Sequence, residues 1–259
     1  MTVKFYKYQG TGNDFVMIDN RTAGLQLKTT QIAFLCDRRF GIGADGLILL
    51  QNIADFDFEM VYFNSDGRES TMCGNGGRCL VQFAHDLGVI KSHSKFLAVD
   101  GPHKATINEE GNVALQMKDV SDVEVGEDYM VLNTGSPHYV SFVPNVDEVD
   151  LVEEAQEIRY NDRFAAEGIN VNFVEIGTED ELLIRTYERG VEDETLSCGT
   201  GAVAAALAYI TTSNFEASEI AMQTKGGRLA IQFERQDNGF KEVFLVGPAK
   251  MVFKGEIEL

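Results

Sequence analysis

A short cysteine-centred string occurs twice in this chain, and the repetition constrains the fold more than any other feature. The two copies lie 125 positions apart, at Cys73-Gly74-Asn75-Gly76-Gly77 and Cys198-Gly199-Thr200-Gly201-Ala202. The same offset also lays Tyr187 on Tyr62, upstream of each cysteine. An unbroken offset indicates an internal duplication, in which two similar halves each present one cysteine to a common site.

The length of the chain agrees with two domains. At 259 residues it exceeds the usual size of one domain, so two domains of about 120 residues are expected. We place the N-terminal half at residues 1–118, with Cys73, and the C-terminal half at 119–249, with Cys198. The last strand, at 250–259, is expected to close one of the halves, and we assign it to the first half.

Composition and charge exclude several classes of protein. Hydrophobic residues make up 44% and charged residues 24%, which is typical of a globular protein with a sizeable core. Lysine plus arginine number 22 against 41 acidic residues, and a net charge of −19 repels nucleic acid and anionic membranes. With no signal-like segment at Met1–Lys7 and only four cysteines, we expect a cytoplasmic protein with reduced thiols.

Each cysteine motif lies between a predicted strand and a predicted helix. The strands are expected at Phe56–Asn64 and Leu182–Tyr187. The helices are expected at Arg78–Leu87 and at Ala202–Ile210, and the second is apolar on every side, as a helix enclosed by sheet would be. Other expected elements are a helix capped by Thr29 or Thr30, a buried strand at Leu47–Leu50, and hairpin turns at Gly226-Gly227 and Asn238-Gly239.

A cysteine at the N-terminus of a helix has a chemistry of its own. An ordinary thiol has a pKa near ~8.5, and the unpaired amides and positive dipole end of a helix favour its anion. The backbone amides of Gly74, Asn75, Gly199 and Thr200 could also bind a substrate carboxylate. Glycine suits these positions because a Cβ atom would obstruct close approach of the backbone.

Two such thiols on opposite sides of one carbon would invert its configuration. One thiolate removes a proton from one face and the other thiol delivers a proton to the opposite face. A redox disulfide between Cys73 and Cys198 is the main competing interpretation, together with a binding protein without turnover. Cys36 and Cys79 lie among apolar residues and are expected in the core, and the spacing of Cys73 and Cys79 is unlike that of a zinc site.

Four ordered motifs make the chain resemble a known family over essentially its whole length. They are Gly10-Thr11-Gly12-Asn13-Asp14-Phe15, Cys73 to Cys79, Gly135-Ser136-Pro137-His138, and Glu188-Arg189-Gly190 through to Cys198-Gly199-Thr200-Gly201. This set closely resembles the diaminopimelate epimerase family. The resemblance implies a cofactor-independent and metal-free isomerase that interconverts LL- and meso-diaminopimelate in lysine and peptidoglycan precursor synthesis. It also implies an α/β fold of the α+β kind, a homodimer, and two pseudo-symmetric domains, each a barrel-like, mostly antiparallel sheet around a central helix, with the active site in the cleft between them.

The resemblance assigns roles to matching positions. Cys73 and Cys198 would be the acid and base, the turns Gly74-Asn75 and Gly199-Thr200 would hold the reacting carboxylate, and His138 and Glu188 would assist by binding the ammonium group and supporting the thiols. The residues that would bind the substrate, largely at its distal end, are Asn13, Asn64, Asn170 and Arg189. Ser136 and Gly46 depart from the amides found in some members, so no role is transferred to them. A racemase of another amino acid, on the related proline-racemase or phenazine-biosynthesis scaffold, is the nearest alternative.

Overall fold

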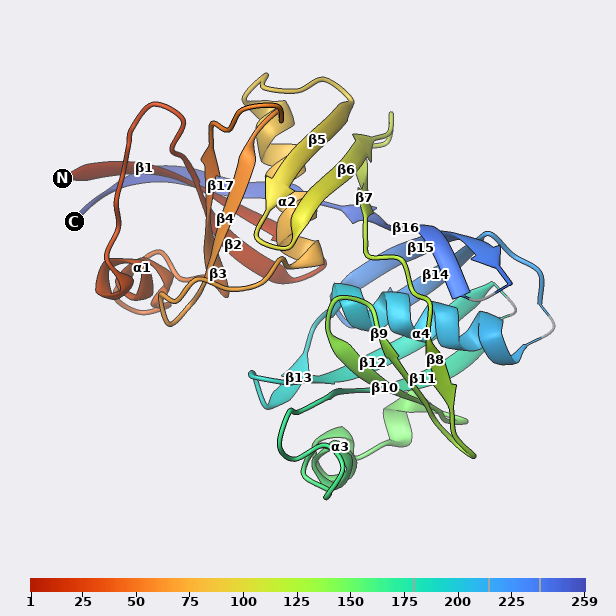
Figure 1. The fold of residues 1–259 in the computed structure, drawn as a ribbon. Helices are drawn as coiled ribbons and strands as arrows, with labels where there is room; N and C mark the ends of the chain where they lie inside the picture. The colour runs from red at the N-terminus through yellow and green to blue at the C-terminus, as the bar shows by residue number, and fades with distance from the viewer. Residues whose placement is uncertain (179, 214, 238) are drawn as a thin grey trace. The chain divides into compact units, whose positions relative to one another are not determined.

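The computed structural model describes residues 1–178, 180–213, 215–237 and 239–259. The chain folds into two compact units, of which the first comprises Met1–Leu115 with Gly247–Leu259 and the second Gln116–Val246. Figure 1 shows the helices and strands along the chain. The helices are α1 (Thr29–Cys36), α2 (Gly74–Asp86), α3 (Leu151–Arg159), α4 (Gly199–Thr212) and the short 3₁₀ helix η1 (Val146–Glu148).

The N-terminal unit contains eight strands, one of which, β7, ends at the boundary with the other unit. They are β1 (Thr2–Gly10), β2 (Asn13–Asp19), β3 (Gly46–Gln51), β4 (Glu59–Asn64), β5 (His93–Ala98), β6 (Gly101–Ile107), β7 (Asn112–Gln116) and β17 (Lys250–Glu258). β1 pairs antiparallel with both β17 and β2, and β2 pairs parallel with β3. The sheet then continues antiparallel to β4, parallel to β5, and antiparallel through β6 and β7.

The C-terminal unit repeats this pairing pattern. Its strands are β8 (Val123–Val125), β9 (Met130–Asn133), β10 (Pro137–Phe142), β11 (Asn170–Thr178), β12 (Glu181–Glu188), β13 (Asp193–Thr195), β14 (Glu219–Thr224), β15 (Gly227–Gln236) and β16 (Gly239–Pro248). β10 and β11 are parallel, β11 and β12 antiparallel, β12 and β14 parallel, and β14 to β16 antiparallel. The same alternation runs from β2 to β7, so the duplication seen in the cysteine motifs extends to the sheets.

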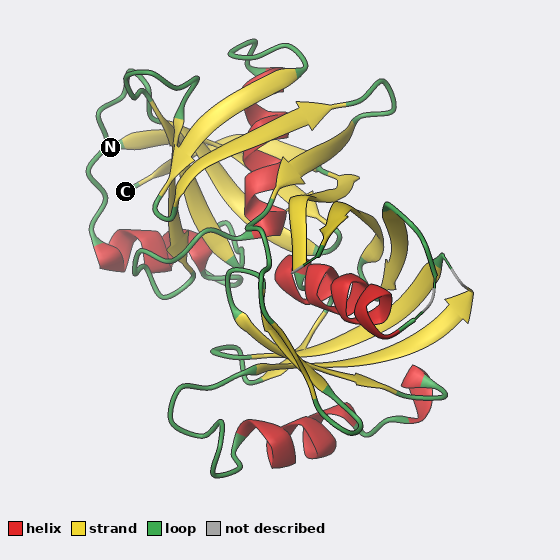
Figure 2. Ribbon diagram, turned by 45° about the vertical axis from the view of Figure 1, so that its right-hand side comes forward, coloured by secondary structure: helices red, strands yellow, loops and turns green. Residues whose placement is uncertain are grey.

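One helix forms the centre of each unit. α2 contacts β1, β2, β3, β4, β6 and β17, and α4 contacts β9, β10, β11, β12, β14 and β15. All nine residues from Ala202 to Ile210 are buried, because strands face α4 on all sides. Figure 2 shows both helices among strands, whereas α1 and α3 lie on the outside of their units. Within the described ranges, none of the helices has the length and apolar character that crossing a bilayer requires.

Several predicted boundaries are wrong by a few residues. α2 begins at Gly74 rather than Arg78, because burial of its glycine-rich first turn outweighs the weak helix propensity of glycine. β4 begins at Glu59 rather than Phe56, and the N-cap of α1 is Lys28 rather than a threonine. The hairpin turn at Gly226-Gly227 is present between β14 and β15, whereas Asn238 lies outside the described residues.

Candidate active site

The two motif cysteines adopt nearly the same backbone conformation. Cys73 is the N-cap of α2, with φ −107° and ψ 123°, and Cys198 is the N-cap of α4, with φ −113° and ψ 111°. Each side chain therefore stands beside the first amides of a buried helix, where both the thiolate and a bound carboxylate are favoured. Cys73 is partly exposed, whereas Cys198 is 9% exposed.

Asn13 contacts the thiol of the N-terminal unit. Its Oδ1 atom lies 3.6 Å from Cys73 Sγ and also accepts a hydrogen bond of 3.3 Å from Asn75 Nδ2. A carbonyl oxygen can only accept, so in this geometry the thiol of Cys73 donates to Asn13. The structure thus brings together three of the residues predicted for the site of this unit.

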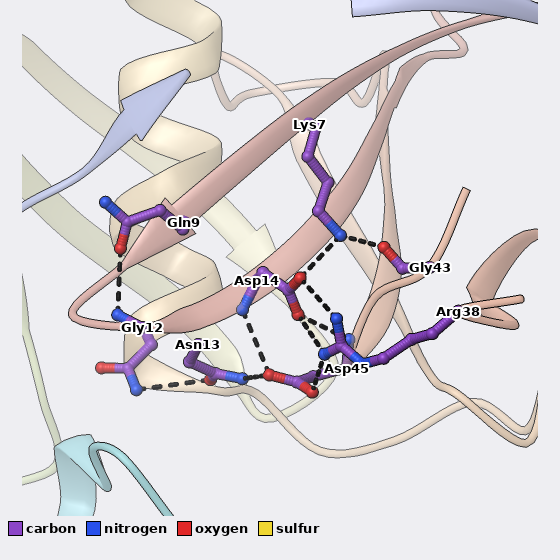
Figure 3. Close-up of polar contacts among 9 residues, drawn as sticks. Lys7, Gln9, Gly12, Asn13, Asp14, Arg38, Gly43 and Asp45 are labelled. Carbon is purple, nitrogen blue, oxygen red and sulfur yellow. Dashed lines mark hydrogen bonds and ion pairs between the residues drawn. The ribbon is translucent and has the colours of Figure 1, made fainter. Parts of the chain in front are cut away.

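The orientation of Asn13 is set by a charged cluster behind it (Figure 3). Asn13 Nδ2 donates to Asp45 Oδ2 at 2.6 Å, and Arg38 bridges Asp45 and Asp14 with Nη2 at 2.7 Å from each. Lys7, 5% exposed, forms an ion pair of 2.8 Å with Asp14 and donates to the Gly43 carbonyl. Burial opposes ionisation of Asp14, but hydrogen bonds from Arg38 and Lys7 outweigh it and lower its pKa to about 2.

Two further positions of the N-terminal unit lie opposite each other. Asn64, at the end of β4, pairs with Gly46 at the start of β3, and Asn64 is exposed. A Cβ atom on Gly46 would stand 2.6 Å from both the Phe63 carbonyl and the ring of Tyr62. In this chain a side chain at position 46 would therefore collide with β4.

In the C-terminal unit a hydroxyl group faces the thiol. Thr200 Oγ1 lies 3.5 Å from Cys198 Sγ and 2.9 Å from His138 Nε2. His138 is fully buried, and Asn172 Nδ2 lies 3.1 Å from its other nitrogen, Nδ1. Asn172 is fixed in turn, because its Oδ1 accepts from Thr186 Oγ1 at 3.0 Å.

This network defines the protonation of His138. An amide nitrogen only donates, so Nδ1 of the neutral ring accepts from Asn172. We assign the ring proton to Nε2, which lies 2.9 Å from Thr200 Oγ1 and 3.5 Å from Asn170 Nδ2. Nε2–H then donates to Thr200 Oγ1, and between Thr200 Oγ1 and Cys198 Sγ either atom can be the donor. Burial lowers the pKa of His138 to about 3, which is consistent with a neutral ring. His138 is therefore linked to the Cys198 thiol through Thr200.

The remaining predicted residues of this unit lie around Ser136. Asn170 Nδ2 donates to Ser136 Oγ at 2.8 Å, and its Oδ1 accepts from the Arg189 amide at 2.9 Å. The Arg189 guanidinium contacts Ser136 Oγ at 3.4 Å and the Glu167 carbonyl at 3.0 Å. Glu188, partly exposed, ends β12 directly before Arg189. Ser136 thus joins two residues predicted to bind the distal end of a substrate.

The other cysteines lie in the cores, as predicted. Cys36 and Cys79 are 3% and 0% exposed, and burial raises the pKa of each to about 12. Such thiols stay protonated at neutral pH. In the part of the chain that the structure describes, no three His, Cys, Asp or Glu side chains are grouped as a metal site would require.

Sequence reasoning missed the residues that hold the site in place. Asp45 and Asn172 orient Asn13 and His138, but each is separated from its partner by more than thirty positions and reaches it only through parallel pairing of strands. The sequence signal for Asp45 and Asn172 is weak, because polar residues near strand ends are common in turns.

The chain closely matches known proteins in sequence. A family model described as diaminopimelate epimerase matches residues 5–123 and 130–252. The diaminopimelate epimerase of Flavobacterium psychrophilum is 53% identical over 259 residues, which cover 98% of this chain and 100% of the relative. That of Chlorobaculum tepidum is 44% identical over 258 residues, covering 96% and 99%.

Solved structures with low sequence identity share the fold. A Bacillus anthracis phenazine biosynthesis protein of the PhzF family superposes with a TM-score of 0.73 at 16% identity, covering 100% of both chains. A probable proline racemase from Agrobacterium radiobacter K84 gives a TM-score of 0.68 at 14% identity, covering 99% of this chain and 93% of the other. These likenesses confirm the predicted fold class.

Proposed function

This chain belongs to the diaminopimelate epimerase family, and from that premise we propose that it interconverts LL- and meso-diaminopimelate by two-base proton transfer between Cys73 and Cys198. It is an isomerase. The observation that carries the mechanism is the shared geometry of the two cysteines, each the N-cap of the buried central helix of its unit. The domains expected at 1–118 and 119–249 each supply one thiol to this reaction.

The proposed reaction transfers one proton to the enzyme and one from it. The thiolate of one cysteine removes the α-hydrogen as a proton, and the electron pair of the broken C–H bond stays on the carbon. The thiol of the other cysteine then donates its proton to the opposite face, and the two side chains end with exchanged protonation states. These two thiols suffice, so the proposed reaction uses no cofactor.

Charge that develops on the substrate carboxylate requires stabilisation at the moment of transfer. The backbone amides of Gly74, Asn75, Gly199 and Thr200 lie in the first turns of α2 and α4 and are the proposed binding partners of that carboxylate. Preorganised donors of this kind usually lower the barrier more than any other single group in an active site.

The polar side chains of each unit have supporting roles in the proposal. His138 holds Thr200 so that its hydroxyl donates to the Cys198 thiolate, and Glu188 is assigned to the substrate ammonium group. Asn13 and Asn64 contact the substrate from the N-terminal unit. Asn170 and Arg189, already joined through Ser136, bind its distal end, where the guanidinium can hold a carboxylate in two places.

We assign the protein to the cytoplasm and propose that it is a homodimer. The two-base reaction needs reduced cysteines, and a reducing compartment keeps them so. β17 exposes the adjacent apolar residues Met251, Val252 and Phe253, each at least 46% accessible, which favours a partner surface. Light scattering of the purified protein should give twice the chain mass of 28.6 kDa, and a mass of one chain would contradict the dimer.

The reaction is tested by incubating the reduced protein with LL-diaminopimelate in deuterated water. Two-base transfer predicts that meso product carries deuterium at the inverted carbon while recovered LL substrate carries little, because each base returns its proton to its own face. Chiral chromatography with mass spectrometry measures both isomers.

The control for this experiment is Cys36→Ala, which removes a buried thiol outside the proposed site and should leave deuterium incorporation unchanged. Turnover of another amino acid in place of diaminopimelate would support the racemase alternative. Activity only after oxidation of the cysteines would instead indicate redox chemistry.

A further inference from the structure

Arg78 is a fully buried cation in the central helix of the N-terminal unit. It is 0% exposed, and its Nη2 atom lies 3.4 Å from Thr11 Oγ1. Among the described residues, neither Nε nor Nη1 has a hydrogen-bond partner, and no acidic side chain forms an ion pair with it. An isolated buried charge costs several kcal/mol, so its retention in a core needs a reason.

The guanidinium lies against the first turn of α2. A Cβ atom placed on Gly10 would stand 3.3 Å from each of Arg78 Nη2, Cys79 Sγ and the Asn75 carbonyl. These atoms therefore surround one point beside the turn that follows Cys73. Burial lowers the pKa of Arg78 to about 10, and the charges of Cys79 and Cys73 oppose this shift.

Only one of these two thiols is suited to carry a charge. Cys79 is completely buried, and burial raises its pKa to about 12 in spite of the nearby Arg78. Cys73 is partly exposed and stands at the helix N-terminus. The anion that Arg78 can stabilise is therefore the thiolate of Cys73.

Other titratable groups packed against α2 are already engaged. Asp14 on β2 is bound by Lys7 and Arg38, and Tyr8 on β1 donates to Asp86 at 2.6 Å. Asn13 has the opposite effect to Arg78. Its Oδ1 atom accepts a hydrogen bond from the thiol and so favours the protonated form of Cys73. The two neighbours thus stabilise the two protonation states between which an acid–base residue must move.

In the C-terminal unit the position that corresponds to Arg78 holds an apolar residue. The position 125 residues later is Val203, within the uninterrupted buried run of α4. Cys198 lies instead 3.5 Å from the Thr200 hydroxyl, which is held by a neutral His138. The duplicated helix therefore places different groups around its two cysteines.

We propose that Arg78 is a positioning residue that stabilises the thiolate of Cys73 through its buried charge. The proposal rests on the proposed function, since it is the proton transfers of that reaction that require this thiolate. Removal of the charge should disfavour the anion, and each unit of increase in thiol pKa lowers the thiolate fraction at neutral pH about tenfold.

The test measures the alkylation of Cys73 by iodoacetamide as a function of pH, in a background with Cys36→Ala and Cys198→Ala. Mass spectrometry of peptides separates the labelling of Cys73 from that of Cys79. Arg78→Met should move the midpoint upward by about one pH unit or more and lower the rate at pH 7 about tenfold. Arg78→Lys, which keeps a charge, should restore at least half of this shift.

A control separates electrostatics from packing. Leu80→Met makes a volume-conserving change at a neighbouring buried position of α2 and should leave the alkylation midpoint unchanged. Because Arg78→Met also removes a buried charge, its melting temperature should equal or exceed that of the background protein. A lower melting temperature with an unchanged midpoint would overturn the proposal in favour of a structural role.

Where Arg78→Met does not fold, Arg78→Gln carries the same test, since its amide can still contact Thr11. An unchanged alkylation midpoint in whichever of the two variants folds contradicts the proposal. The proposal is also contradicted if Arg78→Met and Arg78→Gln both fail to fold while Arg78→Lys folds. Alkylation needs no substrate. A shifted midpoint in a protein without epimerase activity would therefore support Arg78 and refute the proposed function, whereas normal epimerisation with an unchanged midpoint would do the reverse.

Discussion

Cys73 and Cys198 begin helices of the same backbone form, yet the two units surround them differently. Cys73 donates to the amide oxygen of Asn13, and the helix that it begins contains a buried cation, Arg78. Cys198 lies beside the hydroxyl of Thr200, and its helix is buried without interruption from Ala202 to Ile210. The duplication has kept the N-cap position that holds each thiol beside helix amides and has changed the side chains around it.

The largest effect should come from removing either thiol. Cys73→Ala and Cys198→Ala should each lower kcat for epimerisation by about 10³-fold or more, because general acid–base groups contribute factors of 10² to 10⁴. Steady-state assays from both isomers measure this loss. Near-normal activity of either variant would contradict the two-base mechanism, since the thiol of one unit alone would then be enough for epimerisation.

A smaller loss is expected for Thr200→Val, which keeps the backbone amide but removes the hydroxyl between His138 and Cys198. We expect kcat to fall about tenfold to a hundredfold, with a smaller change in KM, because a donor to the thiolate is lost. Thr200→Ser retains the hydroxyl and should recover most of the activity. Equal losses in both variants would assign the effect to packing of the methyl group.

The corresponding test in the N-terminal unit is Asp45→Asn. This change replaces the carboxylate that accepts from Asn13 Nδ2 with a neutral amide, and it removes the ion pair between Asp45 and Arg38. We expect kcat/KM to fall about tenfold as Asn13 loses its fixed orientation. The control is Asp66→Asn, an exposed change in the same unit; a matching loss there would refute the assignment.

The smallest effect concerns stability in acid. Burial lowers the pKa of His138 from 6.5 to about 3, so between these values the unfolded chain binds a proton that the folded protein does not. The free energy of unfolding must then decrease as pH falls through this window, by about 1.4 kcal/mol per pH unit for one proton. His138→Gln removes this contribution.

Urea unfolding at pH 6, 5 and 4 measures the slope. The decrease should be less steep for His138→Gln than for the parent protein, while carboxylates such as Asp14 contribute equally to both. Parallel curves would mean that His138 is protonated in the folded state, and the neutral donor chain to Cys198 would be wrong.

Much of this architecture could be predicted because the repeat carries local information. Glycines after each cysteine, followed by apolar runs, predicted two buried helices, and the family motifs predicted the fold. Sequence spacing did not predict that Arg78 is buried, because a long charged side chain within an apolar helix usually reaches solvent. Nor did it place Asp45 beside Asn13, since that contact depends on the parallel pairing of β2 with β3.

The return of β17 has a consequence for how the chain folds as it is synthesised. β1 lies between β2 and β17, and β17 is encoded after the whole C-terminal unit. During translation the C-terminal unit can therefore close first, while β1 has an unpaired edge until the last residues emerge. The half that bears Cys73 is the first to be made, yet its sheet gains β17 only after the C-terminal unit has been synthesised.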